Sequence, residues 1–173
     1  MTVFRSINQI ISILLMCSAA LLITVLYFEY VLDLKPCKLC TWQRVPHIVV
    51  LFLGLFILTK NSFKTTFCSL CTIVIFSGFL LSGYHVGVEY KLWSGPVTCS
   101  GNNLSTTLSA NLFLEAILNT PIVRCDEIKW SFIGISMAGW NFLISFVLSI
   151  TWSIITVYFV KLYRNQLSSS ASQ

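Results

Sequence analysis

Residues 131–160 read SFIGISMAGWNFLISFVLSITWSIITVYFV, a run of thirty residues without a charged side chain. Three more windows lack charge, at 6–28, 45–59 and 65–88, and the second spans a membrane only if it borrows a few residues from its polar start. A helix that crosses the hydrocarbon core needs about 20 apolar residues. The pattern therefore predicts an all-α membrane protein, a four-transmembrane-helix bundle with spans at about 7–28, 41–59, 65–88 and 131–160.

The composition excludes a water-soluble protein. Of the 173 residues 56% are hydrophobic and only 10% are charged, whereas soluble domains carry about 25% charged residues. We expect one membrane domain, with loops at 29–40 and 89–130 on one side and a turn at 60–64 and a tail at 161–173 on the other. The first window is longer than the core of a signal peptide, so we expect it to remain as a helix.

The distribution of basic residues indicates the orientation. The side with both termini carries five basic residues and no acidic ones: Arg5, Lys60, Lys64, Lys161 and Arg164. The other side carries six basic and all six acidic residues, so a bare count of Lys and Arg decides nothing. Charges next to the spans weigh most, and they predict that both termini are cytoplasmic.

The seven cysteines divide by topology. Cys37 and Cys40 lie in the first outer loop, and Cys99 and Cys125 lie in the second. Because disulfides persist in oxidising compartments such as the periplasm, these four are the candidates for redox chemistry. The remaining three lie within the spans, and we expect them to pack there as inert thiols: Cys17, Cys68 and Cys71.

The Cys37-Lys-Leu-Cys40 motif lies where the second helix is expected to begin. A helix N-terminus and a nearby cation both lower the pKa of a thiol. Arg44 follows Cys40 by one turn, and two roles stay open for it: it stabilises the Cys40 thiolate and an anionic head group beside it, or it anchors the helix end at the interface. His47, a further turn along, is expected to be hydrogen-bonded at a helix interface.

The spacing of two cysteines does not by itself make a redox site. Cys68-Ser-Leu-Cys71 repeats the C-x-x-C spacing within apolar sequence, where a buried thiol is inert. We expect no metal at either pair, because a closed zinc site needs four ligands and no further histidine or cysteine cluster completes one.

The second outer loop contains a helical pattern between its two cysteines. Apolar residues recur at helical spacing from Leu104 to Ala116, and Pro121 follows. The pattern predicts a short interfacial helix, or equally an ordinary loop helix packed on the outer ends of the spans. In either case the loop is long enough to carry Cys125 toward the first loop.

Several segments together resemble the disulfide bond formation protein B family. They are KPCKLCTWQR at 35–44, YHVGVE at 84–89, GPVTC at 95–99, CDEIKW at 125–130 and SMAGWN at 136–141. The resemblance covers nearly the whole chain. Two spaced cysteine pairs, an arginine four residues after the second cysteine and four spans form a far more specific combination than any one element.

The resemblance implies a protein-disulfide:quinone oxidoreductase of the bacterial inner membrane. A periplasmic DsbA-like thiol oxidase would pass electrons to a Cys99–Cys125 disulfide, with Cys99 taking the mixed disulfide. The electrons would then reach Cys37–Cys40 through a Cys37–Cys125 bridge, and Cys40 would face the quinone with Arg44 beside it.

The resemblance also implies the cofactor and the partners. The quinone would be ubiquinone or menaquinone, and the other partners would be the thiol oxidase and the lipid bilayer, with no nucleic acid. His85 and Glu89 fit the family pattern at the outer end of the third span, where they would either line the quinone site or cap the helix.

Three alternative interpretations fit the sequence less well. A four-span scaffold with structural disulfides is disfavoured, because the first loop is too small for an ordinary interface and a C-x-x-C closes too short a loop to stabilise much. A reverse-running reductase resembling vitamin K epoxide reductase would share the helical site but need a partner of opposite redox poise. A transporter lacks support, because the spans show no intramembrane carboxylate and no broken helix pair.

Overall fold

The computed structural model describes residues 2–59, 63–96 and 123–171. Within them lie four long helices: α1 (Thr2–Tyr30), α2 (Lys38–Thr59), α3 (Lys64–Glu89) and α5 (Met137–Ala171). Each contains a stretch that is long and apolar enough to cross a bilayer. The predicted four-helix membrane bundle is therefore confirmed.

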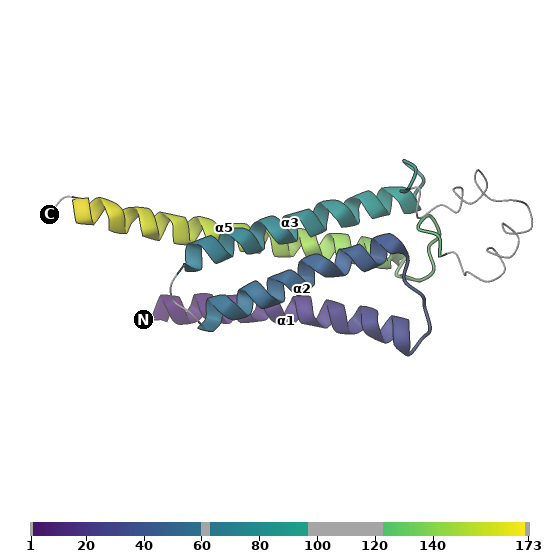
Figure 1. Cartoon of the computed structure of the whole chain (residues 1–173), viewed down its shortest axis with the longest axis horizontal. Helices are drawn as coiled ribbons and strands as arrows, with labels where there is room; N and C mark the ends of the chain where they lie inside the picture. Colours follow the sequence, from purple (N-terminus) through teal and green to yellow (C-terminus); the bar gives the residue numbers. More distant parts are fainter. Residues whose placement is uncertain (1, 60–62, 97–122, 172–173) are drawn as a thin grey trace, which may run out of the picture.

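The helices run alternately up and down the long axis of the molecule (Figure 1). Helix α1 begins and α5 ends at one end of the bundle, and the loop after α1 and the described residues that follow α3 lie at the other. Helix α2 packs between α1 and α3, and α5 packs along α3, whereas α1 hardly touches α5. The first loop and the described parts of the second thus meet at one end of the bundle, where α1 and α5 make few contacts with each other.

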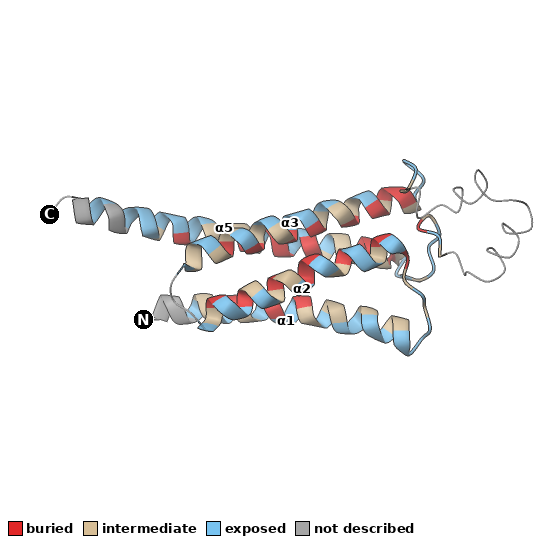
Figure 2. Ribbon diagram, viewed as in Figure 1, coloured by how far each residue is buried: buried red, intermediate tan, exposed pale blue. Residues whose placement is uncertain are grey.

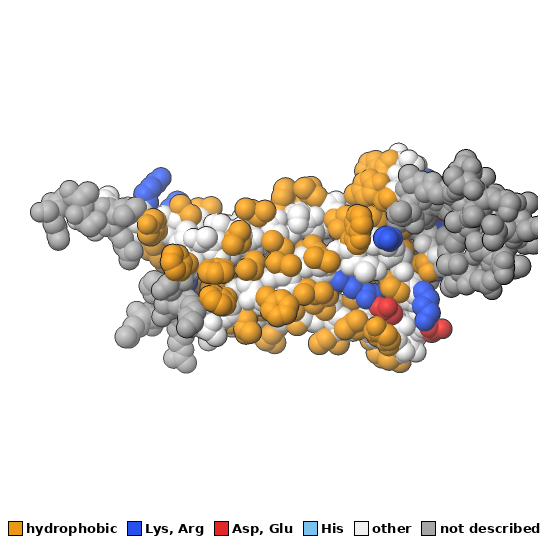
Figure 3. All heavy atoms as spheres, in the orientation of Figure 1, with side chains coloured by type: hydrophobic (Ala, Val, Ile, Leu, Met, Phe, Trp, Pro, Cys, Tyr) orange, Lys and Arg blue, Asp and Glu red, His pale blue; other side chains and the backbone are white. Residues whose placement is uncertain are grey.

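The exposed surface of the bundle is apolar along its length. Ile11, Val50 and Trp152 are fully buried between helices, and the buried positions in Figure 2 lie where helices face one another. Large apolar side chains such as Phe52, which is 72% exposed, point outward instead. Figure 3 shows these side chains along the middle of the bundle, with charged side chains toward its ends. Such a surface suits contact with lipid.

Close packing of α1 on α2 depends on a small residue. A Cβ atom added at Gly54 would lie 2.3 Å from Cδ2 of Leu15, well inside van der Waals contact. Small residues let neighbouring helices approach in this way in membrane proteins. Gly54 therefore sets the spacing of α1 and α2 near the middle of the bundle.

The fourth helix begins six residues later than the sequence pattern predicted. Residues 131–136 instead form a hairpin, in which β1 (Ser131–Phe132) pairs antiparallel with β2 (Ile135–Ser136). Ile133 and Gly134 form the turn with positive φ angles of 53° and 76°, as tight hairpins require. Ser136 then caps α5 by accepting a 3.0 Å hydrogen bond from the Gly139 N–H. The apolar run hid this boundary, because hydropathy alone does not distinguish a hairpin from a helix.

The three cysteines within the spans differ in their burial. Cys68 and Cys71 are fully buried in the helical core, as expected, whereas Cys17 is exposed. The buried face of α1 runs through Leu14 and Ser18, and Cys17 lies to one side of it. The predicted helix around 104–116 lies outside the described residues.

Candidate redox site

Cys37 forms the N-cap of α2. Its carbonyl oxygen accepts the first helical hydrogen bond, from the Thr41 N–H at 3.1 Å. Its sulfur accepts a hydrogen bond from the Cys40 N–H at 3.2 Å, in the place where a serine or aspartate oxygen usually caps a helix. The Cys40 Sγ lies 2.9 Å from the Cys37 Sγ, and both are free thiols. The C-x-x-C motif is thus built around a helix N-terminus, as the spacing predicted.

The surroundings of Cys37 favour its thiolate. Three donors converge on its sulfur: the Cys40 thiol, the Cys40 N–H, and Nε2 of His85 at 3.6 Å. Hydrogen bonding from Cys40 is the largest cause that lowers the pKa of the Cys37 thiol, and His85 adds to it against the opposing effect of burial. The sequence led us to place the stabilised thiolate on Cys40, but the described contacts place it on Cys37.

Cys125 lies in the same small apolar cluster as the C-x-x-C pair. Cys37, Leu39, Val88 and Cys125 are each no more than 5% exposed, and Cys40 packs against them. Cys125 takes part in a disulfide. The second loop therefore does carry Cys125 to the first loop, as its length had suggested, whereas Cys99 lies outside the described residues.

The segment around Cys125 is held by charge pairs. Arg124 donates from Nε and Nη2 to the two carboxylate oxygens of Asp126, at 3.0 and 2.7 Å. The Arg124 guanidinium lowers the pKa of the Asp126 carboxyl. Arg124 also lies 3.3 Å from Glu127. Arg124 thus pairs with acidic side chains on the far side of Cys125, at the partly exposed surface of the loop.

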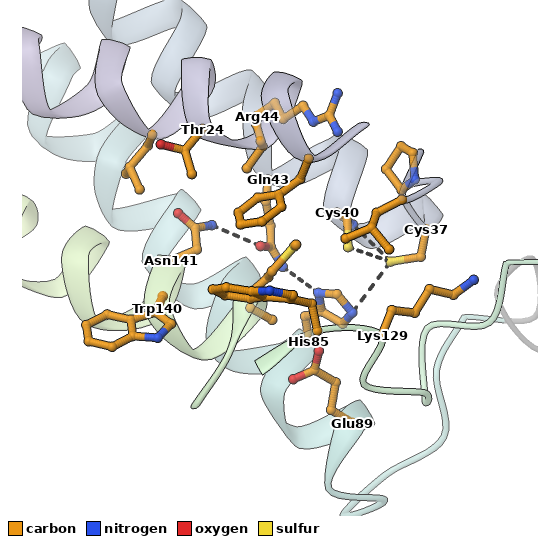
Figure 4. Close-up of a pocket in the computed structure, with 18 of the residues that line it drawn as sticks. Thr24, Cys37, Cys40, Gln43, Arg44, His85, Glu89, Lys129, Trp140 and Asn141 are labelled. Carbon is orange, nitrogen blue, oxygen red and sulfur yellow. Dashed lines mark hydrogen bonds between the residues drawn. The ribbon is translucent and has the colours of Figure 1, made fainter. Parts of the chain in front are cut away.

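A cavity of about 440 Å³ opens beside the cysteine pair. Val25 and Phe28 of α1 and Trp140 of α5 contribute to its apolar walls, and Cys37 and Cys40 line it as well. The close-up in Figure 4 shows the polar side chains of α2 and α3 that reach toward it. Its size and its mostly apolar lining are typical of a site for a small organic ligand.

Arg44 lines this cavity and pairs with a residue of another helix. Its Nη1 donates to Oε2 of Glu29 in α1, and both side chains are about four-fifths buried or more. The Arg44 Nε is buried and has no hydrogen-bond partner among the residues that the structure describes. The contact described for the guanidinium is thus with the Glu29 carboxylate, and both roles considered for Arg44, beside Cys40 and at the helix end, stay open. Sequence analysis did not predict this pairing, because Glu29 and Arg44 lie 15 residues apart on different helices.

A line of hydrogen bonds leads from Cys37 into the bundle. Gln43 Nε2 donates to Nδ1 of His85 at 2.8 Å, and Asn141 Nδ2 donates to Oε1 of Gln43 at 2.9 Å. His47 Nε2 lies 3.1 Å from Oδ1 of Asn141. The dashed lines in Figure 4 follow the first part of this line. His47 is thus hydrogen-bonded at a helix interface, as expected, whereas Gln43 and Asn141 were missed.

Glu89 closes the outer end of α3 against α5. Its carboxylate accepts a hydrogen bond from the hydroxyl of Ser136, the residue that caps α5. Both Glu89 and His85 line the cavity. Glu89 therefore contacts the N-terminal end of α5 and also lines the cavity, so it fits both roles that were considered for it.

The C-x-x-C pair at the start of α2 lies beside a third possible metal ligand. A histidine does join the C-x-x-C pair, because one ligand atom each from Cys37, Cys40 and His85 lie within 4.8 Å of one another. Among the described residues no fourth histidine, cysteine or carboxylate joins this group. A closed structural zinc site needs four ligands.

Comparison with known proteins decides the family. The family model described as "Disulfide bond formation protein DsbB" matches residues 7–155. The chain belongs to the DsbB family. It is 32% identical over 143 residues to disulfide bond formation protein B of Mannheimia succiniciproducens, covering 79% of this chain and 78% of the relative. It is 30% identical over 129 residues to the protein of that name from Hahella chejuensis, covering 70% and 75%. An uncharacterized protein of Rickettsia prowazekii is 28% identical over 147 residues, covering 84% and 86%.

Membership of the DsbB family assigns the general activity. The chain is a disulfide bond formation protein, a membrane-embedded oxidoreductase. The structure brings three of the four predicted redox cysteines together, Cys37, Cys40 and Cys125, and it places Arg44, His85 and Glu89 around the same cavity.

Proposed function

We propose that this DsbB-family protein oxidises a periplasmic DsbA-like thiol oxidase and passes the electrons to a membrane quinone, ubiquinone or menaquinone. The observation that carries the proposal is the joint placement of Cys37, Cys40 and Cys125 beside an apolar cavity between α1 and α5. An electron acceptor dissolved in lipid can reach an apolar cavity between the helices. A water-soluble thiol protein can reach cysteines at the end of the bundle.

The residues of the cavity fit a quinone. Its walls are mostly apolar, as a ring with an isoprenoid tail requires, and Cys40 lies in them. Arg44 offers a buried Nε–H that has no partner in the described part of the chain, and a carbonyl oxygen would satisfy that donor. When bound there, the quinone would accept two electrons and two protons. Arg44 and the apolar walls would hold it, and the Glu29 carboxylate would hold Arg44.

The chain's own thiols supply the remaining steps. A thiolate of the partner attacks Cys99 in the Cys99–Cys125 disulfide, forms a mixed disulfide and releases the Cys125 thiolate. Cys125 attacks Cys37 in the oxidised Cys37–Cys40 pair, forms an interloop disulfide and releases the Cys40 thiolate beside the cavity. Placement of Cys125 in the apolar cluster of Cys37 supports this second step.

The second half of the cycle restores both disulfides. The partner's other thiolate resolves the mixed disulfide and leaves oxidised. The freed Cys99 then attacks Cys125 and expels the Cys37 thiolate. A thiol with a lowered pKa is a better leaving group, so the donors around Cys37 favour this step. Cys37 and Cys40 rejoin as their two electrons pass to the acceptor.

This function places the protein in the bacterial inner membrane with both termini in the cytoplasm and the cysteine loops in the periplasm. The orientation follows from the basic residues next to the spans. It also gives the thiols access to the oxidising compartment in which disulfides persist.

The test uses the purified full chain, a reduced DsbA-like oxidase and a soluble quinone. We expect loss of quinone absorbance that requires both proteins, and we expect Cys40→Ser to abolish it. Cys71→Ser is the matched control, because it removes one thiol of a C-x-x-C pair from the apolar core. Normal turnover by Cys40→Ser would refute the assignment, and so would the absence of turnover by the unaltered chain. Net transfer from hydroquinone to an oxidised partner would indicate the reverse reductase instead.

A further inference from the structure

The hydrogen bonds behind His85 have a fixed direction. A side-chain amide nitrogen can only donate and an amide oxygen can only accept. Asn141 Nδ2 donates to Gln43 Oε1 at 2.9 Å, so the Gln43 nitrogen is the end of that amide that faces His85. It donates to His85 Nδ1 at 2.8 Å. Nδ1 therefore acts as an acceptor, and the neutral ring carries its proton on Nε2.

The proton on Nε2 is the one that Cys37 needs. His85 Nε2 lies 3.6 Å from the Cys37 sulfur, so this tautomer presents an N–H to the thiolate. The other neutral tautomer would present a lone pair to the sulfur and would oppose the thiolate. The choice of tautomer thus decides the sign of the interaction between His85 and Cys37.

The orientation of the Asn141 amide is set in turn by His47, which lies deeper in the bundle. The Asn141 oxygen can only accept, so His47 Nε2, at 3.1 Å, donates to it. The Asn141 amide is thereby turned so that its nitrogen faces Gln43. Gln43, His47 and His85 are each no more than 6% exposed, and Asn141 is partly buried. Three helices contribute to the line: α2, α3 and α5.

We propose that Asn141 and His47, acting through Gln43, are positioning residues that hold His85 in the tautomer whose Nε2–H faces Cys37. The role of this arrangement rests on the proposed thiol–quinone function, in which Cys37 is expelled as a thiolate when Cys99 attacks Cys125. The arrangement itself is a property of the chain with Cys37 and Cys40 as free thiols. It is therefore measurable without quinone or partner.

The titration of the Cys37 thiol depends on every titratable or charged group near it. The titratable or charged side chains that line the cavity with Cys37 come from both loops and from helices α2 and α3: Lys35, Cys40, Arg44, His47, His85, Glu89, Arg124, Glu127 and Lys129. Cys125 packs in the same apolar cluster as Cys37 and becomes a titratable thiol when its disulfide is reduced. Replacing Asn141 removes none of them, so a change in Cys37 titration reports on the hydrogen-bonded line alone.

The experiment measures the pH dependence of iodoacetamide alkylation at Cys37 in the reduced, quinone-free full chain in detergent. Trypsin cleaves after Lys38, which lies between the two cysteines, so Cys37 and Cys40 fall in different peptides. The peptide with Cys37 also contains Cys17, and fragmentation in the mass spectrometer assigns the alkylation between these two. Asn141→Leu should move the Cys37 midpoint upward by about one pH unit, roughly a tenfold loss of thiolate below the midpoint. The matched control is Thr156→Val, which removes a 2.9 Å bond between α5 and Thr72 of α3 away from the site. It should leave the midpoint unchanged.

A second pair of variants keeps the test decisive if Asn141→Leu does not fold. His47→Leu removes the donor to Asn141 and should raise the midpoint, whereas His47→Gln keeps an N–H donor and should retain the parent value. An unchanged midpoint in folded Asn141→Leu, an equal rise in Thr156→Val, or the same midpoint in both His47 variants would overturn the positioning role. None of these results bears on quinone reduction by the unaltered chain, so the proposed function stands or fails separately.

Discussion

The pairing of Arg44 with Glu29 allows a quantitative prediction for α1 and the cavity. The Arg44 and Glu29 side chains are 17% and 20% exposed, so the pair is neither free in solvent nor fully buried. Breaking a buried pair costs about 3–5 kcal/mol and an exposed one at most about 1 kcal/mol. We therefore expect Arg44→Met to lower the free energy of unfolding by about 2 kcal/mol, because it leaves the Glu29 carboxylate without its partner.

A double-mutant cycle separates this pairing from other effects of the substitutions. Arg44→Met and Glu29→Gln are made singly and together, and the double variant should lose less stability than the sum of the two, by about 1–2 kcal/mol. For a chain of this length 2 kcal/mol corresponds to a melting shift of about 4–8 °C. The assay is thermal unfolding in detergent with a thiol-reactive dye. Cys68 and Cys71 serve as reporters, because both are fully buried in the core.

The same variants test whether Arg44 is free to hold a ligand. Added quinone should raise the melting temperature of the parent chain, since a ligand that binds only the folded state stabilises it. It should do so much less for Arg44→Met, whereas Glu29→Gln keeps the guanidinium and should retain part of the effect. Strict additivity in the cycle would refute the pairing. An undiminished quinone effect in Arg44→Met would refute the role of Arg44 in the cavity.

Replacing Cys68 or Cys71 with Ser should leave quinone turnover near normal, and a dead enzyme would show that the cysteines were sorted wrongly. The pKa of Cys37 is lowered to about 4, so its thiolate forms as the pH rises through 4 and is lost below it. His85→Phe removes one donor, so the alkylation midpoint of Cys37 should rise by about one pH unit, and an unchanged midpoint would contradict the His85 contact. Ser136→Ala removes the cap of α5 and should lower stability by about 1 kcal/mol, read as a melting shift; no shift would mean that α5 does not depend on this cap.

The fold was predictable because charge is excluded from lipid. Four windows without charge predict four spans, and the structure has a long apolar helix at each of them. The boundary before α5 was not predictable from hydropathy, because the hairpin at 131–136 is as apolar as the helix. A local signal did exist: Ile133-Gly134 suits a tight turn, and Ser136 is a common capping residue.

The site was predictable in its cysteines and less so in its polar partners. Topology alone brings Cys37, Cys40 and Cys125 to one end of the bundle. The partner of Arg44 depends on how α1 is rotated against α2, and no short-range pattern carries that information. The same holds for Gln43 and Asn141, which are far apart in the sequence and meet only through helix packing. Polar amides within apolar spans are the signal that could have singled them out.

The two C-x-x-C motifs show that helix position, more than spacing, decides the chemistry of a cysteine pair. Cys37 is an N-cap, so N–H groups of the first turn are free to donate to its sulfur, and His85 adds another donor. Cys68 lies inside α3, where the backbone N–H groups are already used by the helix, and its surroundings are apolar. The same three-residue spacing therefore gives a stabilised thiolate at one site and a packed thiol at the other. A transplant of KPCKLC into the middle of a span would keep the spacing but lose the free N–H groups, and with them the reactivity.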